Sequence, residues 1–479
     1  MAAFPNTAEV RIPQVKILAS GESTDSISIS WNLPASTASA GFPTLKYSLH
    51  KPEGQKVISP TAAELIAKVA ALQTKIFSNP DKKEIEVSDG DYNKFKFVGF
   101  DTSAHHEVMF GKVNNGGTIV HPCAKLSKLN TSIYAGLPTS VKDKVTLDFT
   151  TIPEAMKVVL QALVDNFEEN IEISENISED QKAVNRNVHA VNKAIIKDYW
   201  ETVLEATDNV TFDGFSEFVA ETQNAEQLVA AIEEVYISAT EDFFIKIDQF
   251  CSMFQMLFIP DYNYMLGVGK FISYKDIIKN GEEKSINIIS IGMSCGDRSF
   301  FPSSAVIMKG VPSVSIKSGL PTTYEASVAG WPETIPDTSF INFISIPAWI
   351  PSEIDLPRNL IAAKETTLEP ETYESTEAAR DEEMATAVNK IYKVCKDFCR
   401  TYYSFSLLSS SSVVVSTLLD LTWEPGKRYA VFQAGGEKLF DGFLRSVEHR
   451  ISSSRDGASA TTQLIFAWVE ANGFVLPNK

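Results

Sequence analysis

Four residues between positions 105 and 123 have side chains of the types that bind metal ions: His105, His106, His121 and Cys123. Imidazole and thiolate groups are common zinc ligands, and a hairpin would bring His121 near His105. Adjacent histidines in a strand point to opposite faces, so only one of His105 and His106 can join such a site. The spacing matches none of the usual zinc patterns. The sequence therefore predicts no metal site here.

A second candidate pair is Cys395 and Cys399, which lie four residues apart in a segment of helical periodicity and so share one helix face. A structural zinc ion needs four ligands, and neither a histidine nor a further cysteine lies nearby in the sequence. We interpret both cysteines as small buried apolar side chains.

Motifs for phosphate binding or nucleophilic catalysis are incomplete or missing from the sequence. Gly267–Lys270 resembles part of a phosphate-binding loop, but the full spacing is lacking and Phe271 replaces the hydroxyl that would bind Mg²⁺. H-E-x-x-H does not occur, and the single G-x-S-x-G spacing, at Gly292–Gly296, is not by itself a nucleophile elbow. Acidic pairs such as Glu168–Glu169 lie outside the apolar stripes of their segments, where carboxylates are solvated by default. We predict no catalytic residue, no cofactor and no enzymatic activity.

The composition is that of an acidic globular protein. The 479 residues carry a formal net charge of −18, with 44% hydrophobic and 22% charged residues. An acidic surface repels a phosphate backbone, so we expect no specific nucleic-acid binding. The first residues lack the features of a signal peptide, and no apolar run is long enough to span a bilayer, so we expect no membrane insertion. Five dispersed cysteines favour reduced thiols and synthesis in the cytoplasm.

The most informative stretch runs from Leu418 to Val469, where four strand-like runs are separated by strong turn sequences. Gly435–Gly436 predicts a tight hairpin, because two glycines can both adopt positive φ. The alternation in the third run predicts that Phe443, Val447 and Ile451 share one face and Leu444 lies on the other. The last run is apolar on both faces, which favours a closed barrel or a subunit interface.

These runs also carry a resemblance to a known family. A Pro-Gly turn, a Gly-Gly hairpin, a Leu-Phe-x-Gly run and a closing Thr-x-Leu-x-Phe strand resemble the barrel of late-control-protein-D-like baseplate hub proteins of contractile-tailed phages. The matching residues are Pro425, Gly426, Leu439, Phe440, Gly442, Val447, His449, Thr462, Leu464 and Phe466.

The resemblance implies a homotrimeric ring that joins the tail tube to the central spike and has no catalysis of its own. It also implies two barrels in each chain, one near each end. The expected partners are further copies of the chain, the tail spike and the tube or baseplate proteins. The expected location is the virion, after assembly in the host cytoplasm. A tube-initiator or other baseplate ring or wedge protein is the alternative of the same class, and a cytosolic hydrolase with a β-rich substrate-binding module is the alternative of another class.

The fold class that we predict is α+β, a multidomain protein with β-barrel modules and an inserted acidic helical region. The expected segments are an N-terminal β-rich domain with one helix and a possible first barrel (1–150), an acidic helical insertion (151–257), a β- and loop-rich domain (258–364), a linker and helix (365–403) and a C-terminal β-barrel module (404–479).

Local patterns give more detailed expectations for three of these segments. Residues 61–77 have helical periodicity, and the stripe that includes Val69 should pack on a core. Asn114–Gly117 is a hairpin-turn sequence between two strand-like runs. A helix in the acidic segment should begin at Ser178 or Glu179.

The residues that we expect to form the oligomer interface are the apolar positions of the C-terminal module. We expect an aspartate at Phe466 or Trp468 to abolish oligomerisation, because an unpaired charge would enter a dry interface. His449 is interpreted as filling a strand position at an interface, and Trp423 and Trp468 as packing anchors. The expected interface set is Leu439, Phe440, Phe443, Val447, Ile451, Leu464, Phe466 and Trp468.

Overall fold

The structure is a computed structural model of the 479-residue chain. It describes residues 14–17, 26–35, 42–52, 62–77, 82–88, 94–109, 112–121, 124, 175–187, 190, 251, 255–261, 267–278, 281–295, 305–309, 313–316, 323–325, 329–332, 341–346, 353–356, 392–393, 395–407, 411–454 and 457–471. Most of the predicted acidic helical segment lies outside the described residues.

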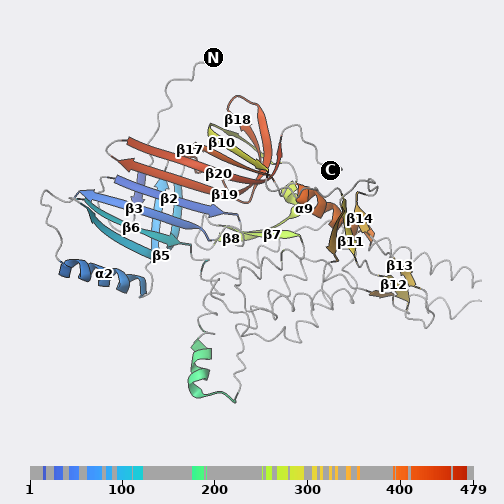
Figure 1. The fold of residues 1–479 in the computed structure, drawn as a ribbon, viewed down its shortest axis with the longest axis horizontal. Coiled ribbons are helices and arrows are strands. Elements are labelled where there is room, and N and C mark those ends of the chain that lie inside the picture. The colour runs from blue at the N-terminus through green and yellow to red at the C-terminus, as the bar shows by residue number, and fades with distance from the viewer. Residues whose placement is uncertain are drawn as a thin grey trace, which may run out of the picture.

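The described part of the chain is mostly β-strand, with few helices (Figure 1). The largest sheet has 12 strands: β1 (Gln14–Ile17), β2 (Ser26–Pro34), β3 (Thr44–Pro52), β4 (Lys82–Ser88), β5 (Lys94–Met109), β6 (Lys112–Val120), β9 (Glu282–Ile286), β10 (Ile288–Cys295), β17 (Ser411–Leu418), β18 (Arg428–Gln433), β19 (Lys438–Ser454) and β20 (Gly457–Ala471).

Three smaller sheets and the helices account for the remaining described elements. The sheets are β14 (Ala329–Trp331), β11 (Ala305–Lys309) and β15 (Ile341–Ser345); β13 (Thr323–Glu325), β12 (Ser313–Ile316) and β16 (Glu353–Leu356); and β7 (Met256–Asp261) with β8 (Gly267–Ser273). The helices are α2 (Ala62–Phe77), α9 (Tyr274–Ile278) and the helical residues 179–187 and 395–407. None of the helices among the described residues is long and apolar enough to cross a membrane.

The large sheet joins the two ends of the sequence. Its strands pair in the order β1-β4-β5-β6-β3-β2-β19-β20-β17-β10, and β18 pairs with both β19 and β9. The antiparallel β2–β19 pair places Trp31 opposite His449 and Leu33 opposite Val447. Strands from the predicted N-terminal and C-terminal domains therefore form one continuous sheet.

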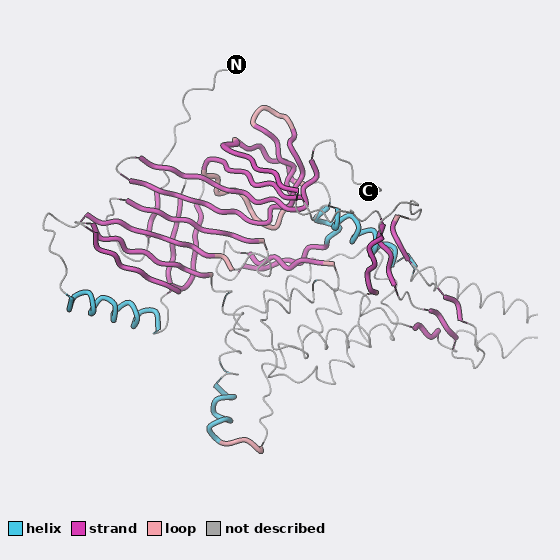
Figure 2. The backbone as a smooth tube through the Cα atoms, in the orientation of Figure 1, coloured by secondary structure: helices cyan, strands magenta, loops and turns pink. Residues whose placement is uncertain are grey.

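Within the N-terminal part, β5 belongs to two strand layers. Its first half pairs with β4 and its second half with β6, and the register shifts between Asp101 and Ser103. A shift of this kind bends a strand and allows it to pass from one layer to another. Figure 2 shows strands of this part crossing behind the others at a steep angle. The two layers enclose a core that contains Trp31, Phe97 and Leu45, all buried.

The C-terminal part pairs around a compact core. β19 is long enough to pair with β18 through its first half and with β2 through its second half, while β20 pairs along its other edge. β9 pairs with β18, and β10, which follows after Asn287 alone, pairs with β17. The hydrogen-bonded path itself ends at β1 and β10, so a closed barrel remains a prediction. The α+β class also remains a prediction, because the described elements are mostly strands.

Several local predictions are confirmed. Gly435 and Gly436 have φ of 131° and 98° in the turn between β18 and β19. The helix of residues 179–187 begins after Ser178, whose hydroxyl accepts a hydrogen bond from Gln181 N at 3.3 Å. Gln181 Oε1 in turn accepts one from Ser178 N at 3.2 Å, which completes a capping box.

The hairpin predicted at Asn114–Gly117 is wrong. These residues lie inside β6, where Asn115 pairs with Leu49 on one side and His106 on the other. A Cβ atom added to Gly117 would lie 2.5 Å from the Ser103 carbonyl oxygen and 2.9 Å from the Tyr47 hydroxyl. Close packing of the neighbouring strands therefore requires glycine at position 117. A sequence that is typical of a turn thus lies inside a strand.

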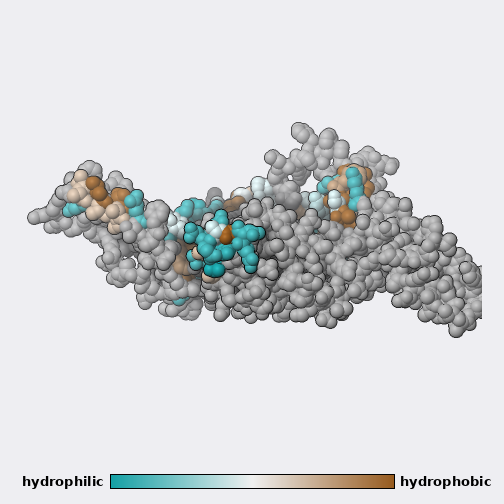
Figure 3. Space-filling model, turned by 90° about the horizontal axis from the view of Figure 1, so that it is seen from below, coloured by the Kyte–Doolittle hydropathy of each residue, from teal (hydrophilic) through white to brown (hydrophobic). Residues whose placement is uncertain are grey.

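The packing predicted for the helix of residues 61–77 is also wrong in part. The helix forms, but Val69, which belongs to its predicted core stripe, is 54% exposed. Ile66 is exposed on the same helix. Figure 3 shows a partly apolar patch over α2, at the left of the view. Helical periodicity thus predicted the helix, but the stripe that it assigned to a core is exposed at Val69.

Candidate assembly interface

The residues predicted to form the oligomer interface are mostly inside the chain's own core. Phe440, Phe443, Val447, Ile451, Leu464 and Phe466 are buried, whereas Leu439 and Trp468 are partly buried. Strands of the same chain already cover the six buried side chains. The interface role of the set remains a prediction, and the fully covered members offer little surface to a second chain.

The inner cluster of the C-terminal module is built mainly from aromatic and branched side chains of β17 to β20, with Trp423 from the turn before β18 and Ile286 from β9. The Phe440 and Phe466 ring centroids lie 5.1 Å apart at a steep angle, and Trp423 lies 6.0 Å from Phe466 in an edge-to-face contact. Such pairs stabilise a core beyond the effect of area burial alone, by about 1 kcal/mol each. Trp423 is therefore a packing anchor, as predicted. The full cluster is Ile286, Val413, Val415, Trp423, Tyr429, Val431, Phe440, Leu444, Val447, Leu464, Phe466 and Val469.

The prediction that Phe443 and Val447 share a face is wrong, because the register between β19 and β20 shifts twice around these residues. Shifts occur between Asp441 and Phe443 and between Leu444 and Ser446. The first shift inserts an extra residue into β20, and the second inserts one into β19, so only the second moves the following side chains of β19 to the opposite face. Leu444 and Val447 consequently lie in the inner cluster, and Phe443 lies in a second cluster on the other side.

The second cluster joins the sheet to the helix of residues 395–407. Trp468 packs 4.8 Å from Phe443 and 4.5 Å from Phe405, measured between ring centroids. Phe405 stacks at 4.0 Å on Tyr274, the first residue of α9. Trp468 therefore acts as an anchor between the C-terminal sheet and the adjacent helices.

Trp468 reaches this position through a strained backbone. Its φ is 50°, a left-handed value that is unusual for a bulky residue. Two residues of β20, Trp468 and Val469, face the single Gly442 between the Asp441–Glu470 and Phe443–Ala467 pairs, which is a β-bulge. A Cβ atom at Gly442 would lie 3.2 Å from that of Phe466, so the position opposite the bulge has little space.

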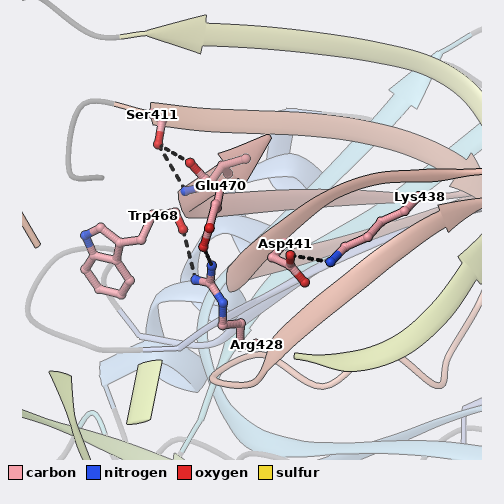
Figure 4. A network of polar contacts seen from close by, with 7 residues as sticks. Ser411, Arg428, Lys438, Asp441, Trp468 and Glu470 are labelled. Atoms are coloured by element: carbon pink, nitrogen blue, oxygen red, sulfur yellow. Dashed lines mark hydrogen bonds and ion pairs between the residues drawn. The ribbon is translucent and has the colours of Figure 1, made fainter. Parts of the chain in front are cut away.

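Side chains provide hydrogen bonds to the backbone groups that the bulge removes from the ladder (Figure 4). Ser411 Oγ donates to the Val469 carbonyl at 2.9 Å and accepts from Val469 N at 3.0 Å. Arg428 donates to the Trp468 carbonyl at 3.0 Å. Buried backbone groups need such partners, so these contacts stabilise the bulge.

The Arg428 guanidinium is buried beside two carboxylates. It lies 3.5 Å from Glu470 Oε2, with both side chains almost fully covered. Burial lowers the pKa of Arg428, and the charges of Asp441 and Glu470 oppose that shift. Lys438 pairs with Asp441 at 2.6 Å near the surface. A buried arginine needs its partners, since an uncompensated charge in the interior is strongly unfavourable.

A lysine side chain of β9 contacts the C-terminal module near the turn that precedes β18. Lys284 Nζ of β9 lies 4.1 Å from the Trp423 ring centroid and donates to Thr422 Oγ1 at 2.6 Å. Partial burial lowers the pKa of Lys284, and the negative charges of Asp420 and Glu282 oppose this shift. These contacts attach β9 to the turn that precedes β18.

The described residues do not assemble a metal site. His105 pairs with Gly116, and His121 follows Val120, which pairs with Phe100. Five residue positions along antiparallel strands separate the two histidines by roughly 17 Å. The expected proximity of His121 and His105 is therefore not found, and no group of three His, Cys, Asp or Glu side chains in the described ranges could hold a metal ion.

Cys395 and Cys399 have the environment predicted for them. Both are buried on the helix of residues 395–407, and neither forms a disulfide. Cys399 Sγ donates to the Ala329 carbonyl at 3.8 Å. Burial raises the pKa of each thiol to about 12, so both remain protonated at neutral pH.

The chain is similar to several solved structures of tail proteins, at low identity. A tail protein from Neisseria meningitidis MC58 has 9% identity, with 97% of each chain covered. A 43 kDa tail protein of prophage MuSo2 from Shewanella oneidensis has 10% identity, with 96% of this chain and 99% of that chain covered. The E. coli c3393 protein, described as a type VI secretion component with structural similarity to T4 tail proteins gp27 and gp5, has 10% identity over 95% of this chain and 76% of that one.

Each of these three similarities has a TM-score of 0.36, which is too low to establish a shared fold. No protein-family model matches the chain, and a search of characterised protein sequences found no match.

Proposed function

We propose that this protein is a structural component of a phage tail baseplate, the hub ring that links the tail tube to the central spike. In this proposal the chain acts as a homotrimer, is assembled in the host cytoplasm and remains in the virion. Its role is geometric, and none of its residues is catalytic.

The observation that carries the proposal is the position of the family-like residues in the C-terminal module. Pro425 and Gly426 form the turn before β18, where Gly426 has φ of 85°. The Gly435–Gly436 hairpin then leads into β19, and the Thr-x-Leu-x-Phe run lies in β20. The elements expected from the resemblance thus occur in the expected order. Gly426 is additionally required by packing, since a Cβ atom there would lie 2.6 Å from Ile259.

We further propose that the four strands of this module, together with β9 and β10 of the preceding β- and loop-rich segment, form the barrel of the resembled family. Pairing proceeds from β10 through β17, β20 and β19 to β18 and then to β9. β9 and β10 are separated by Asn287 alone, so the path returns through β9 to the stretch of chain from which it began, while the outer edge of β10 has no partner among the described strands. The buried cluster that contains Phe440 and Phe466 would fill the interior, as side chains do in small barrels. The six strands β1–β6 are the candidate for the first barrel of the chain.

A ring of this kind needs rigid modules and a few adhesive edges. The β2–β19 pair joins the two strand modules, and the bulge at Trp468 and the buried Arg428 fix the packing within the C-terminal module. A rigid body with unpaired strand edges is suited to repeated contact with identical neighbours, which closes into a ring when the rotation permits.

Deletion of the gene in the genome that encodes it tests the proposed function. We expect particles whose tails lack an assembled baseplate, with normal tails restored by the wild-type gene in trans. Purified wild-type particles should contain the chain in a fixed ratio to the spike protein. Infectious particles with complete baseplates that lack the chain would overturn the proposal. Hydrolysis of cell-wall or polysaccharide substrates by the purified protein would favour the hydrolase alternative.

A further inference from the structure

β10 is an apolar strand at one end of the large sheet. Among the described strands it pairs only with β17, so its other edge has no partner strand in that part of the chain. Its residues, IISIGMSC, include no charged side chain. Ile289, Ile291 and Met293 are 55%, 44% and 62% exposed. Large apolar side chains along an unpaired edge are unusual in a protein that remains monomeric, because such edges template aggregation.

The neighbouring strand β9 shows how an edge of the same sheet is protected. β9 pairs only with β18 among the described strands, but its sequence is EEKSI. Glu282 and Glu283 are exposed, and Lys284 is partly exposed. Charges of this kind oppose pairing with another chain. The charged residues that protect the edge of β9 are therefore missing from β10, which begins one residue after β9 ends.

The exposed side chains of β10 continue the core face of the sheet. Ile291 pairs with Val415 and Met293 with Val413, and both valines are buried in the inner cluster. Directly paired residues lie on the same face of a sheet. The apolar face thus extends one strand beyond the area that the chain itself covers.

We propose that the free edge of β10 binds a second copy of this chain, by addition of a strand from the second copy to the sheet. The proposal rests on the proposed function, since it names the contact that builds the ring. A net charge of −18 opposes contact between copies over most surfaces, and an uncharged strand avoids that repulsion. The sheet ends at β1 on its other side, so head-to-tail contact supplies each copy with one donor edge and one acceptor edge.

A matched pair of variants tests this contact. Met293→Glu places a charge in the proposed interface, and Ser285→Glu places the same charge at an exposed position of β9. By sedimentation, we expect Met293→Glu to weaken self-association about tenfold or more, as for an unpaired charge in a dry interface. Ser285→Glu should leave it unchanged. Equal self-association of wild type and Met293→Glu would overturn the proposal, as would a wild-type chain that stays monomeric at the highest soluble concentration.

Hydrogen exchange of the wild-type protein tests the same contact without a variant. Amides of residues 288–295 should exchange quickly in dilute solution and more slowly as oligomers form. Exchange in this segment that does not depend on concentration, while the protein does associate, would place the interface elsewhere and overturn the proposal. Self-association through β10 in a protein that is missing from tails would refute the proposed function alone. Normal baseplates built from Met293→Glu would refute the β10 contact alone.

Discussion

The ring of His449 on β19 packs 4.7 Å from the ring of Trp31 on β2, measured between centroids, at the point where the N-terminal and C-terminal strands join. Nδ1 of His449 lies 2.9 Å from the Thr462 hydroxyl on β20, and the side chain is buried. The histidine therefore fills a strand position inside the chain, at the contact between its two strand modules.

Burial makes this histidine a source of acid sensitivity. It lowers the pKa of His449 to about 3, with Asp420 opposing the shift. The unfolded chain takes up the proton below about pH 6.5, so the folded state loses stability as pH falls from there towards 3. We expect the wild type to lose about 2 kcal/mol between pH 6.5 and 5 through this group. Denaturant titrations should show a smaller loss in His449→Gln; an equal loss would contradict the assignment.

The buried ion pair between Arg428 and Glu470 gives a second prediction. Glu470→Gln should lower the free energy of unfolding by about 3 kcal/mol, because it leaves the buried guanidinium without its nearest charge. Met at both positions should recover much of that loss. Arg450→Gln removes an exposed pair with Glu448 and should cost about 1 kcal/mol or less. Urea denaturation compares the variants, and similar losses from both pairs would contradict a buried role for Arg428.

Close packing around Gly117 predicts a large effect from one added methyl group. Gly117→Ala would force a Cβ atom against the Ser103 carbonyl and the Tyr47 hydroxyl, so we expect a cost of about 1–3 kcal/mol. Gly292→Ala is the control, because its Cβ would meet nothing within 4 Å. Thermal unfolding of both variants checks this. A neutral Gly117→Ala would support the turn that the sequence had predicted.

The buried thiols predict low reactivity. With pKa values raised to about 12, Cys395 and Cys399 should resist alkylation in the folded protein and react fully in denaturant, since the thiolate is the reactive form. Peptide mapping after timed alkylation measures each site. Rapid modification of either cysteine in the native protein, or its protection by added zinc, would contradict the buried apolar interpretation.

Turns and helix caps could be predicted from the sequence, because each depends on a residue type with one clear physical role at that position. The two glycines of the β18–β19 hairpin have positive φ, and Ser178 with Gln181 forms a capping box. These features depend on only a few neighbouring residues. The strands of the C-terminal module were found for the same reason, because alternation and turns bound them clearly.

Long-range pairing could not be predicted in this way. Nothing in the strand that contains Trp31 specifies His449 as its partner, and the glycines of β6 resemble a turn until β3 and β5 are placed beside them. The bulge at Trp468 reverses the faces of β20, and the shift between Leu444 and Ser446 reverses those of β19, with no mark of either in the alternation pattern. The expected interface residues were the most apolar ones, and the core takes those first.

Phe466→Asp and Met293→Glu therefore differ in what they report about oligomerisation. Phe466 is fully buried in the inner cluster, so Phe466→Asp should unfold the module whether or not a ring forms. Met293 on β10 is exposed, so a charge there can be tested in a folded chain.

The mass of the purified protein in solution tests the hub assignment most directly. Light scattering combined with native mass spectrometry distinguishes multiples of the 52.8 kDa chain. We expect a homotrimer that binds a baseplate spike protein. A hexamer would contradict the hub assignment and favour a tube-initiator or another ring of the tail, and a chain that remains monomeric at all soluble concentrations would contradict a ring built through β10.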